Sequence, residues 1–202
     1  MKNVLISIGG NCNSNISNLN FEQIIAVDSG IKHIYNHSLE PSILVGDLDS
    51  ISKEDYQKVI ETNINIESYQ ENKDHTDFEL SLNKIENPHS KNIFIIGGEG
   101  GDIDHMLSVF FTISNKEFYQ NITWLYDKQS ILFKNNISLQ IDTNMNFSLI
   151  PLTDLKSLNI KGAKWELENE DVESGHSLTL RNQTEGDSLI ISCEEGKFAF
   201  IY

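Results

Sequence analysis

Arginine is almost absent from this chain of 202 residues, in which Arg181 is the only one. A site for phosphate groups must therefore rely on lysine, on a metal ion, or on backbone N–H groups at the starts of helices. Acidic residues outnumber basic ones by 30 to 15, so the formal net charge is −15 at pH 7. Such a surface repels the phosphates of nucleic acids and of anionic lipids, and neither is an expected partner.

Cysteine and long apolar runs are also scarce. Cys12 and Cys193 lie near opposite ends of the sequence, without the CxxC or Cys/His spacing of a zinc site, which favours free thiols over a disulfide. The apolar run at residues 4–8 is too short for the core of a signal peptide. No stretch approaches the roughly 18 apolar residues of a spanning helix. We therefore expect a soluble, cytoplasmic protein.

The first part of the sequence alternates short apolar runs with segments of helical periodicity. This order is typical of a mostly parallel sheet covered by helices. The predicted strands are residues 4–8, 24–27, 43–45, 64–66, 93–96 and 122–126, and the predicted helices are residues 53–60, 77–85 and 102–113. The pattern predicts a Rossmann-like α/β domain over residues 1–127.

After about Asp127 the pattern changes to short strands with turn residues between them and no convincing helix. These strands are predicted at residues 130–133, 137–141, 146–150, 163–167, 188–192 and 197–201. The last two are interpreted as a hairpin that turns at residues 194–196. We therefore predict a β-sandwich domain over residues 128–202.

A first acidic cluster follows the predicted strand at residues 43–45, where open parallel sheets bind their ligands. The sequence there is Gly46-Asp47-Leu48-Asp49-Ser50, and an extended backbone points Asp47 and Asp49 to the same side. Two carboxylates this close repel each other unless a cation lies between them, and oxygen ligands suit Mg²⁺. The alternative is an acidic turn in which Asp49 or Ser50 caps the next helix.

A second cluster, Lys73 to Glu79, precedes another predicted helix. Thr76 and Glu79 form a predicted capping box, which puts Asp77 in the first turn. The positive end of the helix dipole favours an ionised carboxylate at that position, ready to bind a metal ion. The alternative is a helix start without further function, and His75 is expected to be solvated or to take part in capping.

A third cluster, residues 97–105, is rich in glycine and joins the predicted strand at residues 93–96 to a helix. Its glycines let the backbone approach a ligand closely, and the helix start offers N–H groups to phosphate oxygens. It has neither the GK[ST] of a Walker A loop nor the strict spacing of a dinucleotide fingerprint.

Taken together and in this order, the clusters make the chain resemble the thiamin pyrophosphokinase family over nearly its whole length. The family pattern has an Asp-x-Gly, a Gly-Asp-x-Asp-Ser, a Thr-Asp that opens a helix, a glycine-rich loop leading to Asp-His, a Gly-x-Lys-Trp and a Ser-x-x-Asn-like segment. The matching segments are Asp28-Ser29-Gly30, Gly46 to Ser50, Thr76-Asp77, Gly97 to His105, Gly162-Ala163-Lys164-Trp165 and Thr179-Leu180-Arg181-Asn182.

The resemblance implies transfer of diphosphate from ATP to the hydroxyl group of thiamin, with Mg²⁺ as cofactor and AMP as the second product. It also implies a homodimer with its sites at the subunit interface. In such a dimer the α/β domain binds Mg-ATP, and the β-sandwich of the partner subunit helps to bind thiamin.

The resemblance further implies roles for individual residues. Asp47, Asp49 and Asp77 become the magnesium ligands, and Asp47 or Asp77 could take the proton of the thiamin hydroxyl. The implied nucleotide-binding residues are Asp28, Gly30, Gly98, Gly100, Gly101, Asp104 and His105. The implied thiamin-binding residues are Thr76, Thr179 and Asn182.

Two positions depart from the family pattern. Asp102 stands where the family usually has arginine, and an anion near a triphosphate should weaken nucleotide binding. Arg181 replaces a serine before Asn182. Trp165 is a candidate to stack on the pyrimidine ring of thiamin, although a tryptophan there more often belongs to a core. Two alternatives stay open: transfer to another hydroxymethyl heterocycle such as a pterin, and a nucleotide-binding relative without turnover.

Overall fold

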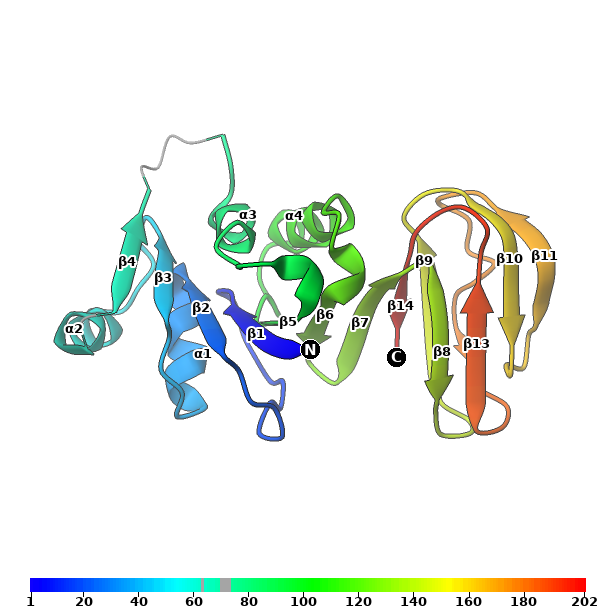
Figure 1. Ribbon diagram of the computed structural model, residues 1–202, viewed down its shortest axis with the longest axis horizontal. Coiled ribbons are helices and arrows are strands. Elements are labelled where there is room, and N and C mark those ends of the chain that lie inside the picture. The colour runs from blue at the N-terminus through cyan, green and yellow to red at the C-terminus, as the bar shows by residue number, and fades with distance from the viewer. Residues whose placement is uncertain (63, 70–73) are drawn as a thin grey trace. The chain divides into compact units, whose positions relative to one another are not determined.

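The computed structural model describes residues 1–62, 64–69 and 74–202 (Figure 1). They divide into two compact units. The first consists of Met1–Ile113 and Asn121–Lys128, and the second of Ser114–Gln120 and Gln129–Tyr202. The first unit has a parallel sheet with helices and the second has antiparallel sheets, so the predicted fold class, α/β followed by all-β, is confirmed.

The sheet of the first unit has the strand order β6-β5-β1-β2-β3-β4, and neighbouring strands run parallel. Its strands are β1 (Lys2–Ser7), β2 (Gln23–Val27), β3 (Ile43–Gly46), β4 (Asn65–Ser68), β5 (Lys91–Ile96) and β6 (Ile122–Tyr126). From β1 the chain builds β2, β3 and β4 in one direction, and β5 and β6 lie on the other side of β1. The order therefore reverses between β1 and β5, which makes the carboxyl ends of these two strands a topological switch point.

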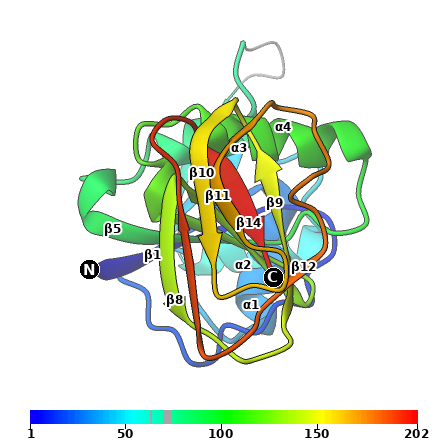
Figure 2. The same cartoon turned by 90° about the vertical axis from the view of Figure 1, so that its right-hand side faces the viewer.

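Helices cover both faces of this sheet, as both views of the ribbon show (Figures 1 and 2). On one side lie α1 (Ile31–Asn36) and α2 (Lys53–Thr62), and on the other α3 (Asp77–Leu82) and α4 (Ile103–Ser114). Side chains alternate across a strand, which explains why runs buried on both faces are apolar throughout. The core under α1 and α2 combines strand and helix residues that include Leu5, Ala26, Leu44, Ile31, Ile34 and Val59.

Short 3₁₀ turns connect several of these elements: η1 (Asp28–Gly30), η2 (Pro88–Ser90) and η3 (Tyr119–Asn121). The predicted helix at residues 77–85 ends earlier than expected, at Leu82, and α1 was not predicted. Among the described residues, no helix has both the length and the apolar character needed to cross a membrane.

The second unit contains two antiparallel sheets, with the strand orders β12-β9-β14-β7 and β11-β10-β13-β8 (Figure 1). The strands are β7 (Gln129–Lys134), β8 (Asn136–Gln140), β9 (Asn146–Pro151), β10 (Leu155–Lys161), β11 (Leu167–Val172), β12 (Asn182–Gln183), β13 (Ser188–Ser192) and β14 (Phe198–Ile201). Residues of both sheets join one core, with Phe147, Leu149 and Phe200 from the first and Leu158, Leu189 and Ile191 from the second. Burial between two sheets is the arrangement of a β-sandwich.

The predicted C-terminal hairpin is wrong. β13 pairs with β8 and β10, whereas β14 pairs with β7 and β9, so the chain crosses from one sheet to the other between them. The predicted turn serves a different purpose, because Glu194 donates its backbone N–H to Lys156 O at 2.9 Å and Lys156 N–H donates to Glu195 O at 3.0 Å. These bonds hold the crossing segment against the start of β10.

The predicted strand at residues 163–167 is also wrong, since residues 163–166 form a loop between β10 and β11, and Leu167 begins β11. Gly162, with φ of +82°, opens this loop, and a Cβ there would lie 2.0 Å from Ser188 O. The backbone is therefore packed too tightly at this glycine to continue as a regular strand. Ala163 keeps only a single β-bridge, to Thr184.

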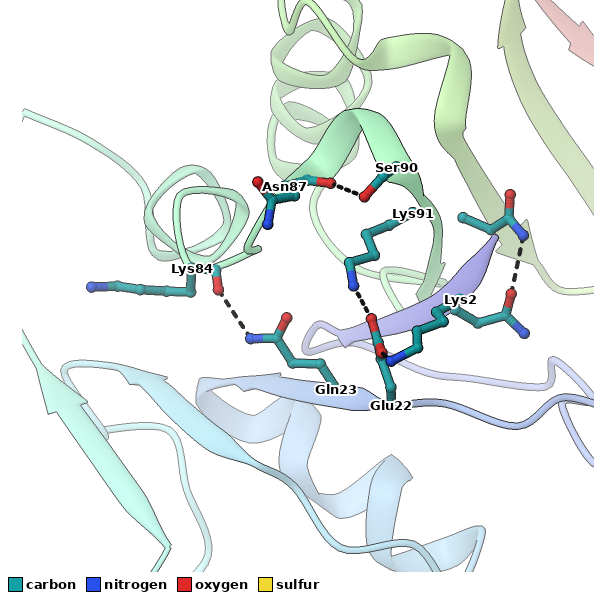
Figure 3. A network of polar contacts seen from close by, with 9 residues as sticks. Lys2, Glu22, Gln23, Lys84, Asn87, Ser90 and Lys91 are labelled. Carbon is teal, nitrogen blue, oxygen red and sulfur yellow. Dashed lines mark hydrogen bonds and ion pairs between the residues drawn. The ribbon is translucent and has the colours of Figure 1, made fainter.

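A polar network joins the amino ends of β1, β2 and β5 (Figure 3). The carboxylate of Glu22 accepts hydrogen bonds from Lys2 Nζ at 2.7 Å and from Lys91 Nζ, and Gln23 Nε2 donates to Lys84 O at 2.9 Å. The hydrogen bond to Glu22 raises the pKa of Lys2, and the bonds from Lys2 and then Lys91 lower the pKa of Glu22. This network lies at the end of the strands opposite to the loops that form the cleft.

Candidate active site

A cleft of about 720 Å³ lies at the carboxyl ends of the parallel strands in the first unit. Its walls come from the loops after β1, β2, β3 and β5, from the start of α3 and from the first half of α4. This is the topological switch point between β1 and β5, the usual ligand position in open α/β sheets. Its volume is in the range of small-molecule and cofactor sites.

The loops after β1 and β5 approach each other so closely that side chains are excluded. Gly98 N–H donates to Gly9 O at 2.7 Å. Gly97 has φ of +93°, and a Cβ there would lie 2.2 Å from Ile8 O. Glycine tolerates both the positive φ and the contact. The floor of the cleft is therefore main chain, and Trp124 supports it by donating from Nε1 to Gly97 O at 3.0 Å.

The loop after β2 places Asp28 against the end of β3. Leu48 N–H points to Asp28 Oδ1 at 3.4 Å, and a Cβ on Gly46, where φ is +146°, would lie 1.6 Å from the same oxygen. Asp28 and Leu48 have φ of 45° and 70°. Non-glycine residues pay about 1–3 kcal/mol each for such backbones, which persist only where the surroundings hold them. Here they bring Asp28 beside the acidic loop.

Asp47 and Asp49 both line the cleft, Asp47 half-buried and Asp49 exposed. They are joined by a hydrogen bond from Asp49 N–H to Asp47 Oδ1 at 3.2 Å. The alternative that Asp49 or Ser50 caps the next helix is wrong. Ser52 Oγ accepts the N–H of Asp55 at 3.0 Å and donates to its carboxylate at 2.8 Å. Helix capping therefore does not explain the acidic residues of this loop.

Thr76 caps α3, as predicted, because its Oγ1 accepts the N–H of Glu79 at 3.2 Å. The Glu79 carboxylate contacts His75 Nδ1 at 3.0 Å. Asp77 is half-buried in the first turn, and both Asp77 and Thr76 line the cleft. The cap and the position on the cleft coexist, so the capping alternative does not exclude a ligand role. Lys73, the first residue of this cluster, lies outside the described residues.

The predicted magnesium ligands Asp47, Asp49 and Asp77 thus share one cleft. Within the described ranges, no three His, Cys, Asp or Glu side chains are close enough to hold a metal ion on their own. Mg²⁺ commonly takes one or two carboxylates and completes its shell with water and substrate phosphates. The oxygen-only donor set fits an ion of this kind that arrives with a phosphate ligand.

The predicted nucleotide-binding residues divide into two groups. Those that line the cleft are Asp28, Gly98, Gly101 and His105. Those outside its described lining are Gly30, Gly100 and Asp104. Packing alone requires a glycine at position 30, since a Cβ there would lie 2.2 Å from Ser7 O. Nucleotide contacts of both groups stay predictions.

In the second unit, Thr179 and Asn182 are buried and hydrogen-bonded to the backbone. Thr179 Oγ1 donates to Leu149 O at 2.9 Å. Asn182 accepts the N–H of Trp165 at 3.2 Å and donates from Nδ2 to Trp165 O at 2.8 Å. The expectation that Trp165 belongs to a core is wrong, because the residue is 56% exposed. Asn182 therefore fixes the backbone of an exposed tryptophan.

Sequence reasoning missed several residues of the cleft. Gly9 and Gly10 line it directly after β1, and a Gly-Gly pair behind a buried strand was the signal that could have found them. Trp124 on β6 also lines the cleft. Its neighbours in the sequence are apolar, so the sequence does not distinguish it from a residue of the core. Glu99, within the glycine-rich segment, is buried. A charged residue in a glycine-rich loop is expected to be exposed, so the sequence carries no signal of this burial.

Comparison with known families decides between the remaining interpretations. Residues 17–125 match the family model described as thiamin pyrophosphokinase, catalytic domain, and residues 134–198 match that of the vitamin B1 binding domain of the same enzyme. The chain belongs to the thiamin pyrophosphokinase family. Its activity is the synthesis of thiamin diphosphate from thiamin. The match to a vitamin B1 binding domain gives no support to a pterin-like acceptor.

Individual relatives agree with this assignment. The thiamine pyrophosphokinase of Bacillus subtilis is 28% identical over 165 residues, which are 79% of this chain and 77% of the relative. The crystal structure of a thiamin pyrophosphokinase family protein from Enterococcus faecalis has a TM-score of 0.86 at 26% identity and covers 99% of this chain and 98% of its own. The structure of the Bacillus subtilis enzyme, at 22% identity with a TM-score of 0.84 and coverage of 99% and 98%, shows the same fold.

The contact between Gly46 and Asp28 leads to a prediction about stability. Gly46→Ala should lower the free energy of unfolding by about 1–3 kcal/mol, because the new methyl group overlaps the Asp28 carboxylate. In a chain of this size the melting temperature should fall by about 2–4 °C per kcal/mol, measured by circular dichroism. Gly175→Ala is the matched control, since Gly175 also has a positive φ, +92°, but open space around it.

Combining Gly46→Ala with Asp28→Ala should restore part of the lost stability, because the second change removes the overlapping oxygens. Equal melting temperatures for Gly46→Ala and Gly175→Ala would show that backbone strain alone, and not the Asp28 contact, limits position 46.

Proposed function

We propose that the chain transfers diphosphate from Mg-ATP to the hydroxyl group of thiamin and releases AMP, with the nucleotide in the cleft of the first unit. The observation that carries this proposal is the meeting of glycine loops and carboxylates at one topological switch point. Diphosphate transfer demands little covalent chemistry from a protein. It depends on aligning the hydroxyl with the β-phosphorus and on neutralising the charge of the phosphates.

Charge supports the metal complex as the true nucleotide substrate. Among the described residues that line the cleft there is no lysine or arginine, but there are the carboxylates of Asp28, Asp47, Asp49, Asp74, Asp77 and Asp102. A bare triphosphate would be repelled by this surface. Bound Mg²⁺ would neutralise the phosphate charge. Asp47, Asp49 and Asp77 are the residues proposed to hold it.

The remaining roles follow from position. Backbone N–H groups of the glycine loop and the side chain of His105 are proposed to contact the nucleotide. Asp47 or Asp77 is proposed to accept the proton that the thiamin hydroxyl loses. Thr76 is exposed beside Asp77 and is the proposed thiamin contact of the first unit.

Residues 128–202 are proposed to bind thiamin and residues 1–127 to be the catalytic, nucleotide-binding domain. Asn182 fixes the backbone of Trp165, and the exposed ring of this tryptophan offers a flat apolar surface to a heterocycle. Thr179, in the same segment as Asn182, is also a proposed thiamin contact, and its hydroxyl donates to Leu149 O. The cytoplasm is the proposed location, a reducing compartment in which the free thiols of Cys12 and Cys193 are stable.

A homodimer with sites at its interface is part of the proposal. Helix α4, which contributes several residues to the cleft, also exposes an apolar stripe of Ile103, Leu107 and Phe111 with exposed fractions of 70%, 42% and 54%. These residues follow one another at a spacing of four, so they share one face of the helix. The proposed occupant of this face is a second copy of the chain.

The metal ligands lead to the central prediction. Changing Asp47, Asp49 or Asp77 to Asn should lower kcat by about 10²–10⁴-fold while the circular dichroism spectrum stays that of the folded protein. AMP release in the presence of thiamin, ATP and Mg²⁺ is the measurement, and EDTA should abolish the release until Mg²⁺ is added back. Glu54→Gln is the control, an exposed carboxylate on α2 that pairs with Lys58.

The opposite pattern is as informative. Variants that unfold easily but turn over normally while folded would mean that these carboxylates serve turns and caps only. A wild-type chain that releases no AMP would identify a relative without turnover.

Asp102 leads to a prediction about nucleotide affinity. It is exposed and lines the cleft just before α4, and a cation there would attract the phosphates. Asp102→Arg should therefore lower KM for Mg-ATP by up to about 5-fold and leave KM for thiamin unchanged, as steady-state kinetics can measure. Asp102→Asn should give part of the gain. If neither change moves KM for the nucleotide, Asp102 lies away from the bound phosphates.

The proposed dimer is tested by mixing inactive variants. Asp77→Asn disables one half of a shared site and Asn182→Ala the other, so mixed dimers should contain one intact site. Random exchange makes about half of the dimers mixed, and about a quarter of the wild-type activity should return. Trp165→Ala is a second partner for the mixture if Asn182→Ala is unstable. Subunits that exchange without any recovery, or a fully active monomer in light scattering, would show that the site is not shared.

A further inference from the structure

We propose that Glu99 is a positioning residue for the nucleotide, one that fixes the loops after β1, β5 and β6 relative to one another. Glu99 belongs to the glycine-rich segment after β5, but its side chain is only 5% exposed. The inference rests on the proposed nucleotide site, because Gly9, Gly10, Gly98 and Gly101 of these loops line the cleft.

The carboxylate of Glu99 gathers N–H groups from two other loops. Oε1 accepts the backbone N–H of Asp127 at 2.8 Å and that of Asn13 at 3.0 Å. Oε2 accepts Asn13 Nδ2 at 2.7 Å and shares the backbone N–H of Asn13 at 3.1 Å. Asn13 follows β1 and Asp127 follows β6, so one side chain connects the ends of three neighbouring strands.

The backbone of Glu99 adds to the same connection. Asn11 N–H donates to Glu99 O at 2.7 Å and Glu99 N–H donates to Asn11 O at 3.2 Å, which forms a β-bridge between the two loops. The adjacent contact is Gly98 N–H to Gly9 O at 2.7 Å. Main-chain N–H groups can bind phosphate only if their directions are fixed, and at this point no regular secondary structure fixes them.

All the donors to Glu99 are N–H groups of Asp127 and Asn13, so a sharp probe removes the acceptor oxygens. Glu99→Met keeps a side chain of similar length but removes both oxygens. Glu99→Gln is a weaker probe, because the Asn13 amide can turn so that its Oδ1 accepts from the new NH₂. A buried donor without an acceptor costs free energy, and the loops should move to relieve the conflict.

The test measures nucleotide binding directly. Calorimetry with the magnesium complex of α,β-methylene-ATP, which lacks the scissile oxygen bridge, gives Kd without turnover. We expect Glu99→Met to raise this Kd and KM for Mg-ATP by about 10-fold, with KM for thiamin changed less than about 2-fold. Measurements are made at a temperature where circular dichroism shows every variant folded. The control is Glu22→Met, which removes a carboxylate at the opposite end of the same strands (Figure 3) and should leave Kd unchanged.

A polarity swap separates positioning from stability. Asn13→Asp alone sets two carboxylates against each other and should also raise Kd. In the double variant Asn13→Asp/Glu99→Gln, the amide at position 99 can donate to the carboxylate at position 13. The total charge is that of the wild type, so most of the affinity should return. If Glu99→Met does not fold, Asn13→Ala removes one donor from an exposed residue and should shift Kd in the same direction.

The outcomes are distinct. Wild-type Kd and KM in Glu99→Met, or in Asn13→Ala where only that variant folds, overturn the positioning role. A double variant Asn13→Asp/Glu99→Gln that binds no better than Asn13→Asp alone also overturns it. A wild-type chain that does not bind the magnesium complex overturns the proposed nucleotide site itself, and this inference with it.

Discussion

The first unit depends on the close approach of the backbones that follow β1 and β5. Gly97 packs against Ile8 O, and Gly98 bonds to Gly9 O, so the space above the sheet is bounded there by main chain and not by side chains. Open parallel sheets leave a crevice where the strand order reverses. Here the glycines at positions 9, 97 and 98 add no side chains to the floor of the crevice. The main-chain surface that is proposed to contact phosphates is therefore a consequence of tight strand packing.

A second constraint is electrostatic. The described lining of the cleft contains carboxylates and no lysine or arginine, in a chain with a net charge of −15. Carboxylates near one another raise the free energy of the empty site, and a divalent cation bound with phosphates relieves it. The same field favours a cationic acceptor such as a thiazolium ring. One charge distribution thus suits both substrates, provided that the nucleotide enters with its metal.

The sequence predicted the first unit well because each local signal agreed with the fold. The strands of the parallel sheet are apolar runs, and the Thr76 cap and the start of α3 follow from residue types alone. The position of Asp47 and Asp49 on the cleft followed from the rule for strand ends, and their grouping with Asp77 followed from the resemblance to the family. Asp28 against Gly46 and the burial of Glu99 were out of reach, because both depend on loops that are distant in sequence and meet only after the sheet has formed.

The second unit shows where such reasoning fails. Adjacent strands with a turn between them favour a hairpin, yet β13 and β14 belong to different sheets, because the turn bonds to Lys156 rather than closing on itself. Asn182, which the family motif predicts to contact thiamin, uses both ends of its amide on the backbone of Trp165, and its contact with thiamin stays a prediction. An amide occupied in this way has little capacity left for a substrate. Its effect on a ligand would pass through the exposed tryptophan that it holds, so a motif residue can be essential to a site without touching what binds there.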